Sequence, residues 1–172
     1  MGGTRTKVAL AATCLVVAGT ASAAVGGVGT STERASLNSF AEVPTLSTRG
    51  IGTFNATINS NTNRIRYTLR YRALSTAVQQ AHIHLGRPAT VGGISAFLCT
   101  NIGGGTPQTP ACPRRRGVVR GVLGPGSVQG PTDQGIGAGQ FNALAKALRQ
   151  GAAYVNVHSA RFPSGEIRGA IR

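Results

Sequence analysis

The chain has 172 residues, with 18 Lys and Arg against 4 Asp and Glu, and a formal net charge of +14. Its length suits one domain with a short extension, and an apolar content of 41% is too high for a disordered polycation. Four acidic residues offer few candidates for paired-carboxylate catalysis, and composition alone assigns no activity.

The first 23 residues are predicted to be a secretory signal peptide. A basic start containing Arg5 precedes the apolar run 8–17, and small residues follow, so that cleavage is expected after Ala23. The run is shorter than the roughly 20 apolar residues that cross a bilayer, and no later segment approaches that length. We therefore predict an exported protein without a transmembrane segment; the alternative is a retained anchor or a lipid at Cys14.

Cleavage would also leave an even number of cysteines. Cys99 and Cys112 remain, and they bracket a stretch rich in Gly, Pro and Thr. In an exported protein such a pair is predicted to form a disulfide that staples the loop. The alternative is a reactive or metal-binding thiol pair, although the spacing matches no C-x-x-C site.

Residues 24–35, rich in Gly, Thr and Ser, are expected to be a flexible linker to a domain at 36–172. Eight segments of that domain are predicted to be strands, because apolar residues alternate with polar ones and turn residues separate the runs. They are residues 37–43, 53–59, 64–72, 80–86, 94–98, 117–123, 152–159 and 166–171. In 64–72, the clearest case, one face is aliphatic and aromatic and the other is mostly arginine.

A change of period near the end of the chain predicts one short helix. Phe141, Leu144 and Leu148 recur at helical spacing within residues 140–150, and Gly151 is a natural stop. Many short strands and one helix predict an all-β fold. We expect an antiparallel β-sandwich or Greek-key barrel of the immunoglobulin-like or superoxide-dismutase-like type.

Two long motifs carry a family resemblance: AHIHLGRPATVGG at 81–93 and AYVNVHSARFPSGEIRGAIR at 153–172. Together with LNSFAEVP at 37–44 and the helix at 142–151, they make the chain resemble the CHRD domain, which is named after chordin and is common in exported bacterial proteins. The resemblance implies an all-β, extracellular or envelope domain with a non-enzymatic binding or structural role. It implies little about mechanism and does not identify a partner.

The three histidines are the main candidates for specific chemistry. His82 and His84 are two apart on a predicted strand, so their side chains share a face. Neutral imidazoles on a rigid sheet suit zinc or copper, and His158 on another strand would complete a three-histidine site. Glu42 or Glu166 would then be a fourth ligand or a partner of a ligand.

This metal site depends on the sheet bringing His158 beside the other two, which no local pattern shows. The alternative is that the histidines hydrogen-bond structurally, with Asn156, Tyr154 and Glu166 as partners in a buried polar network. Acid–base catalysis is a further possibility with less support.

Arginine-rich surfaces raise a second binding hypothesis. Without Arg5 and Lys7 the charge falls from +14 to +12, and guanidinium groups suit sulfate, phosphate and carboxylate groups on polymers. Tyr67 and Tyr71 lie on the strand face opposite the arginines, so we expect no sequence-specific nucleic-acid binding. The two predicted clusters are Arg64, Arg66, Arg70 and Arg72, and Arg114, Arg115, Arg116 and Arg120.

We therefore predict a secreted or otherwise extracytoplasmic protein of the periplasm, cell envelope or extracellular space, without enzymatic activity. Its partner would be an anionic polysaccharide or another extracellular protein. Zinc or copper binding by the histidines is the first alternative function. Arginine-mediated binding of anionic polymers is the second, and solvated charge with only non-specific attraction is its simpler explanation.

Overall fold

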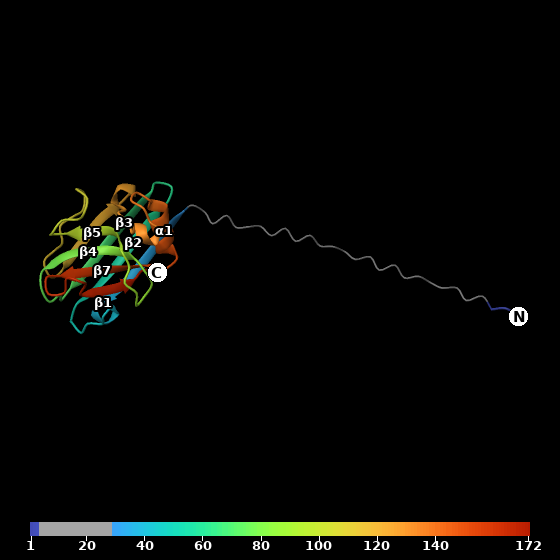
Figure 1. Cartoon of the computed structure of the whole chain (residues 1–172), viewed down its shortest axis with the longest axis horizontal. Coiled ribbons are helices and arrows are strands. Elements are labelled where there is room, and N and C mark those ends of the chain that lie inside the picture. Colours follow the sequence, from blue (N-terminus) through green and yellow to red (C-terminus); the bar gives the residue numbers. More distant parts are fainter. Residues whose placement is uncertain (4–28) are drawn as a thin grey trace.

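A computed structural model describes residues 1–3 and 29–172, and the described chain is built almost entirely from antiparallel strands (Figure 1). The eight strands are β1 (Thr30–Asn38), β2 (Ile51–Asn59), β3 (Arg64–Arg72), β4 (Val78–Leu85), β5 (Ile94–Thr100), β6 (Gly117–Leu123), β7 (Ala153–Ser159) and β8 (Ile167–Ala170). The helices are α1 (Phe141–Arg149) and the single 3₁₀ turns η1 (Ser39–Ala41), η2 (Pro125–Ser127) and η3 (Thr132–Gln134). The all-β prediction is confirmed.

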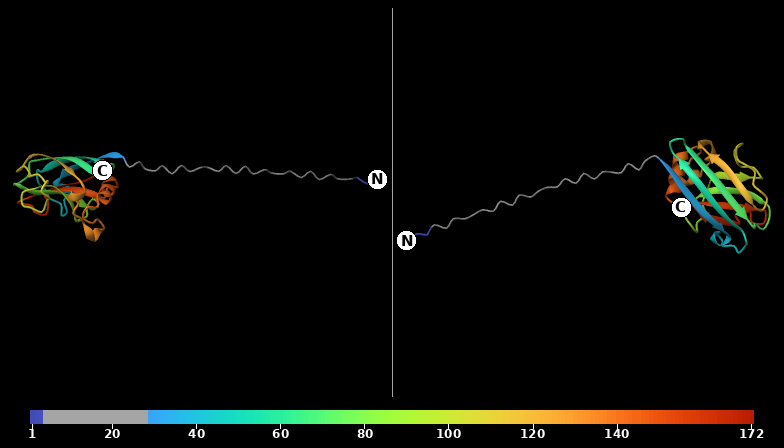
Figure 2. Two further views of the ribbon diagram at one scale, coloured as in Figure 1. Left: turned by 90° about the horizontal axis from the view of Figure 1, so that it is seen from above. Right: turned by 180° about the vertical axis from the view of Figure 1, so that it is seen from behind.

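All eight strands belong to one sheet in the order β5-β4-β7-β8-β1-β2-β3-β6. The sheet folds back on itself and nearly closes, so that β1, β2, β3 and β6 form one layer facing the other (Figure 2). The Tyr67 hydroxyl of β3 donates a hydrogen bond of 2.6 Å to the Leu98 carbonyl of β5, across the interior. The architecture is thus one curled sheet rather than two separate sheets.

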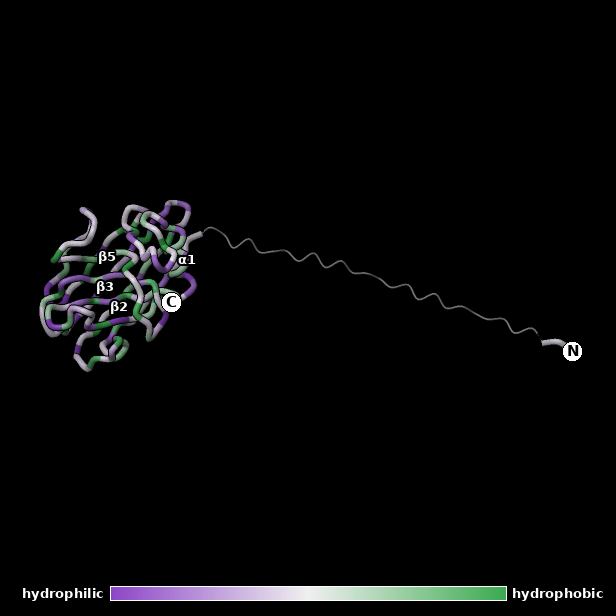
Figure 3. Tube along the Cα trace, viewed as in Figure 1, coloured by the Kyte–Doolittle hydropathy of each residue, from purple (hydrophilic) through white to green (hydrophobic). Residues whose placement is uncertain are grey.

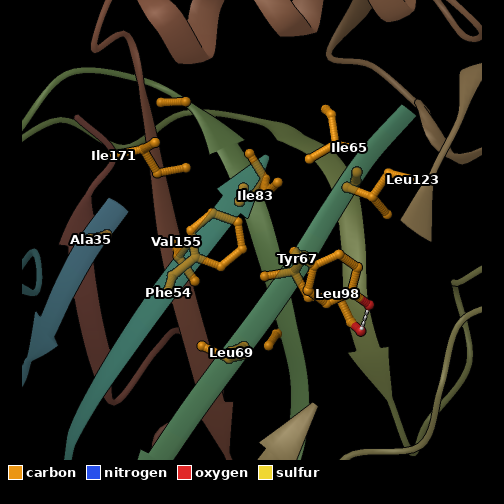
Figure 4. Close-up of a cluster of buried hydrophobic side chains, with 14 of the residues drawn as sticks. Ala35, Phe54, Ile65, Tyr67, Leu69, Ile83, Leu98, Leu123, Val155 and Ile171 are labelled. Atoms are coloured by element: carbon orange, nitrogen blue, oxygen red, sulfur yellow. Dashed lines mark hydrogen bonds between the residues drawn. The ribbon is translucent and has the colours of Figure 1, made fainter. Parts of the chain in front are cut away.

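The core lies between the two layers (Figure 4). Phe54 and Leu69 enter it from one layer, and Ile83 and Val155 enter it from the other; all four are fully buried. Hydrophilic and hydrophobic residues alternate along the strands (Figure 3), as expected where one strand face is packed and the other is solvated. This alternation is what made the strands predictable.

The start of the domain differs from the prediction. Residues 30–35, expected within the flexible linker 24–35, form most of β1, which pairs with β2 along its whole length. The strand predicted at 37–43 ends at Asn38, whose side chain accepts from the Ala41 backbone N–H and starts η1. Serine and threonine on the exposed face of β1 gave it a linker-like composition. Residues 4–28, which include most of the predicted signal peptide and its cleavage site, lie outside the described residues.

The predicted helix is confirmed as α1 (Phe141–Arg149). Its buried residues include Phe141, Leu144 and Leu148, and Arg149 reaches the hydroxyls of Ser31 and Ser60, which ties the helix to the start of β1 and the end of β2. Within the described residues no helix is both long and apolar enough to cross a membrane.

The predicted disulfide joins Cys99 at the end of β5 to Cys112. The loop between them is also tied at its base, where the Asn101 side chain bonds both the backbone N–H and the carbonyl of Cys112. The bond therefore closes a loop with a sequence separation of 13 residues that has little secondary structure of its own.

Removal of this disulfide in Cys99→Ala/Cys112→Ala is expected to lower the free energy of unfolding by about 3 kcal/mol, because the unfolded chain regains the entropy of an open loop of this size. Urea unfolding monitored by circular dichroism measures the loss. Thiol reduction of the unmodified protein should give a similar loss, which separates the missing cross-link from the smaller side chains. A loss below about 1 kcal/mol in both experiments would contradict the prediction.

Candidate functional site

A buried polar layer covers the outer face of β4, β7 and β8. Val155 and Val157 point into the core, so the intervening residues of β7 point outward, yet every residue of β7 is buried. Loops cover this side of the sheet: the Gly92 carbonyl contacts His84 and the Pro163 carbonyl contacts His158. The outward residues are His82 and His84 of β4, Tyr154, Asn156 and His158 of β7, and Arg168 of β8.

The three predicted histidines meet in this layer. His82 lies opposite Asn156 in the β4–β7 register, and His158 lies two residues further along β7, opposite Gln80. One ring nitrogen from each of the three histidines lies within 4.8 Å of the others. His82 Nδ1 is 3.0 Å from His158 Nε2, and the His82 and His84 ring centres are 5.3 Å apart.

Hydrogen bonds to carbonyl groups assign the protons of this cluster. His84 Nδ1 lies 3.0 Å from the Gly92 carbonyl and His158 Nδ1 lies 2.9 Å from the Pro163 carbonyl, so both Nδ1 atoms carry the proton that they donate. The Nε2 atom of neutral His158 is therefore an acceptor, and it receives the Nδ1–H of His82. This leaves Nε2 of His82 and Nε2 of His84 as buried lone pairs without a hydrogen-bond partner among the residues that the structure describes.

Burial keeps all three imidazoles neutral. Burial, together with the neighbouring histidines, lowers the pKa of His82 to about 2. Burial also lowers the pKa of His84 to about 4, although the hydrogen bond to the Gly92 carbonyl acts to raise it. The pKa of His158 is also lowered by burial. Neutral imidazoles with free lone pairs are the form that binds metal ions.

A second polar group lies beside the histidines. The guanidinium of Arg168 stacks 3.7 Å above the centre of the Tyr154 ring, and Tyr154 in turn stacks on His84. Arg168 Nη1 donates to the Thr90 carbonyl, and its Nε lies 3.7 Å from Glu42 Oε2.

Glu42 is held in place by Arg168 and by the Asn156 side-chain amide, which donates to Oε1 of Glu42. Burial raises the pKa of Glu42 to about 7, although Arg168 and Asn156 oppose the rise. Desolvation of this carboxylate therefore outweighs its ion pair.

The two predicted carboxylate partners do not join the histidine cluster. Glu42 contacts Asn156 and Arg168, and Glu166 accepts hydrogen bonds from the backbone N–H and the hydroxyl of Ser75. The potential ligand group within the described residues consists of the three histidines alone. Arg168, which was not predicted as a site residue, is the arginine of this layer; its motif and its two-residue spacing from Glu166 were the available signals.

The predicted arginine clusters are regrouped by the sheet. Arg64, Arg66, Arg70 and Arg72 are exposed on β3 as expected. Arg120 does not stay with its sequence neighbours, because the β3–β6 register places it opposite Thr68. Arg114, Arg115 and Arg116 precede β6, and Arg115 Nε donates to the Leu74 carbonyl.

Comparison with known proteins gives one match. A search of the curated proteins finds no match to the chain. A search of the solved structures likewise finds none. The family description "CHRD domain" matches residues 34–171, which include every strand after the first half of β1 and every residue of the polar layer. This span is nearly the whole described domain, and the protein belongs to the CHRD domain family.

Proposed function

We propose that this protein is an exported CHRD domain that binds zinc or copper through His82, His84 and His158. The family supports a non-enzymatic domain of the extracellular type, and the Cys99–Cys112 disulfide is consistent with an oxidising compartment. The observation that carries the metal proposal is the convergence of three imidazole nitrogens within 4.8 Å in a buried layer.

The hydrogen bonds around the cluster support this proposal. Metal-binding histidines commonly donate their second ring N–H to a carbonyl or carboxylate, which fixes the ring and leaves the other nitrogen for the ion. His84 and His158 both have this arrangement, through Gly92 and Pro163. It leaves Nε2 of each ring free of the covering loops, and Nε2 of His158 lies inside the cluster, 3.0 Å from His82 Nδ1.

The energetics of the unliganded layer also favour an ion. Each buried lone pair without a partner costs about 1–3 kcal/mol relative to water, and Nε2 of His82 and of His84 are two such atoms. A metal ion would satisfy them. Nε2 of His158 has a single lone pair, which now accepts the hydrogen bond from His82. A metal ion bound to this nitrogen would therefore replace that hydrogen bond.

Burial of the ligands favours a retained ion over an open catalytic one. His82, His84 and His158 are only 2%, 7% and 9% exposed, whereas a catalytic zinc keeps a position open to water and substrate. We infer a stabilising or binding role for the ion, in which it holds β4 and β7 to the loops that cover them.

Metal addition is expected to raise the melting temperature of untagged protein that has first been stripped with a chelator. An ion at 100 times its dissociation constant stabilises the folded state by about 2.7 kcal/mol, which corresponds to about 5–10 °C for a domain of this size. The measurement is a thermal melt with and without zinc or copper, together with elemental analysis of the purified protein.

Two variants separate metal binding from general stability. His84→Ala removes a ligand and should abolish the shift. Phe97→Leu alters the ring that packs 4.4 Å from His82 but keeps all three imidazoles, so it should lower the starting melting temperature and keep the shift. Absence of bound metal, with no shift for either ion in the unmodified protein, would refute the proposal.

A further inference from the structure

A basic surface lies on the other layer of the sheet, away from the histidines. Strands β1, β2, β3 and β6 lie side by side there (Figure 2, right), and most of their outward side chains are exposed. We call this surface the arginine face. Its charged residues, all exposed, are Arg34, Arg64, Arg66, Arg70, Arg72 and Arg120.

Strand register turns these arginines into a continuous row. Alternate residues of β3 share a face and are about 6.8 Å apart, and the only interruption of the arginine series is Thr68. Arg120 of β6 lies directly opposite Thr68, so it fills the gap from the neighbouring strand. On the other side of Thr68 the register continues through Asn55 to Arg34 of β1.

No acidic side chain compensates this charge. All four acidic residues of the chain lie in the described part and away from the arginine face. Glu33 points inward from β1 and is 7% exposed, while Glu42 and Glu166 are buried elsewhere; Asp133 is in η3. The arginines therefore repel one another, and a bound polyanion would relieve that repulsion.

The neutral residues of the face indicate the kind of polyanion. On β2, between Arg34 and the arginines of β3, the outward residues are small hydroxyl and amide side chains such as Thr53, Asn55 and Thr57, which suit the hydroxyl groups of sugars. On β6, Val118 and Val122 flank Arg120. The tyrosines of β3 cannot stack on nucleobases, because both are buried and their hydroxyls donate to the carbonyls of Leu98 and Pro113.

We propose that the arginine face binds a linear anionic polysaccharide laid along β3. Its sulfate or carboxylate groups would pair with the guanidinium forks, and its hydroxyl groups would bond the threonine and asparagine side chains. This site is independent of the histidine cluster, and either proposal can fail without the other.

The test compares two variants that lose the same charge. Arg66→Gln/Arg70→Gln/Arg120→Gln removes the centre of the row. The control Arg87→Gln/Arg114→Gln/Arg161→Gln removes three exposed arginines that lie in loops or turns outside strands β1, β2, β3 and β6. All six positions are exposed, so both variants should keep the melting temperature of the unmodified protein, and the binding data then report the surface alone.

Affinity for heparin and for alginate is measured by calorimetry at several salt concentrations. We expect the face variant to bind at least about ten-fold more weakly and the control within about two-fold of the unmodified protein, because only the first loses direct contacts. For the face variant, the plot of log affinity against log salt concentration should become shallower by about 1–3 in slope, in proportion to the lost ion pairs. Binding of heparin only would identify sulfate as the anionic group, and binding of both would identify a site for either anion.

Three results would overturn the proposal. Equal weakening in both variants would mean that net charge alone attracts the polymer. Failure of both polysaccharides to bind near physiological salt would remove the ligand class. Tighter binding of single-stranded poly(dT) than of either polysaccharide, with the same loss in the face variant, would assign the face to nucleic acid.

Discussion

Replacing Arg168 with methionine is expected to destabilise the protein by about 3–5 kcal/mol, the usual cost of leaving a buried charge without its partner. The Arg168 and Glu42 side chains are only 6% and 3% exposed, so water cannot substitute for the lost ion pair. The variant also loses the stack on Tyr154 and the hydrogen bond to Thr90. Urea unfolding at fixed pH measures the change.

The cost should grow as the pH rises above neutrality. The pKa of Glu42 is about 7 with Arg168 lowering it, so it rises further when the arginine is removed. Above pH 7 the folded variant then holds a proton that the folded unmodified protein has released. In that window, each pH unit increases the difference in free energy of unfolding between the unmodified protein and the variant by as much as about 1.4 kcal/mol.

Two further variants show whether the unpaired carboxylate is the cause. The double variant Glu42→Gln/Arg168→Met has neither member of the buried ion pair, so no charge is left without a partner. It should therefore recover part of the free energy of unfolding that Arg168→Met loses, and it should lose the extra pH dependence. Arg161→Met removes an exposed arginine stacked 5.5 Å from the Phe162 ring, and it should change stability by less than about 1 kcal/mol. A loss in Arg168→Met that is independent of pH and unaffected by Glu42→Gln would contradict this explanation.

The strands were predictable wherever solvent and core lie on opposite faces. Along β3 the alternation of arginine with buried aliphatic and aromatic residues is unambiguous, and the structure places it as expected. The polar face of β1 is serine, threonine and one arginine, which is also the composition of a linker. Its pairing with β2 distinguishes the two, and pairing is a non-local property.

The histidine cluster was predictable in composition but not in geometry. The spacing of His82 and His84 fixes a shared face, whereas the position of His158 depends on β7 pairing with β4 across most of the domain. Periodicity also cannot tell that loops cover the outer face, and this burial gives the imidazoles their neutral state. The Glu42–Arg168 pair has the same non-local origin.

Acidification is expected to destabilise the metal-free protein, by about 2 kcal/mol between pH 6.5 and 5. In the folded state the pKa values of all three histidines lie below their ordinary value of 6.5. Below pH 6.5 the unfolded chain therefore binds more protons on its histidines than the folded chain does. Their stabilising contribution is complete above pH 6.5 and is lost as the pH falls.

Glu42 opposes this loss. Its pKa is raised from 4.5 to about 7 in the folded state, so between these values the folded chain holds one proton that the unfolded chain has released. His82 and His84 alone exclude two protons in this range, so the net difference still favours the unfolded state by at least about one proton, or about 1 kcal/mol per pH unit. Urea unfolding in a chelator from pH 7.5 to 5 measures the slope.

Glu42→Gln tests both parts of this balance, because it removes the opposing proton and leaves the three histidines. Its loss of stability on acidification should steepen by about one proton, or about 1.4 kcal/mol per pH unit, while its stability near pH 7.5 should fall, because the buried Arg168 loses its ion-pair partner. A flat profile between pH 7 and 5 in the unmodified protein would mean that the folded histidines accept protons without cost. Saturating zinc should raise stability most at the higher pH, because protons compete with the ion for the same imidazole lone pairs.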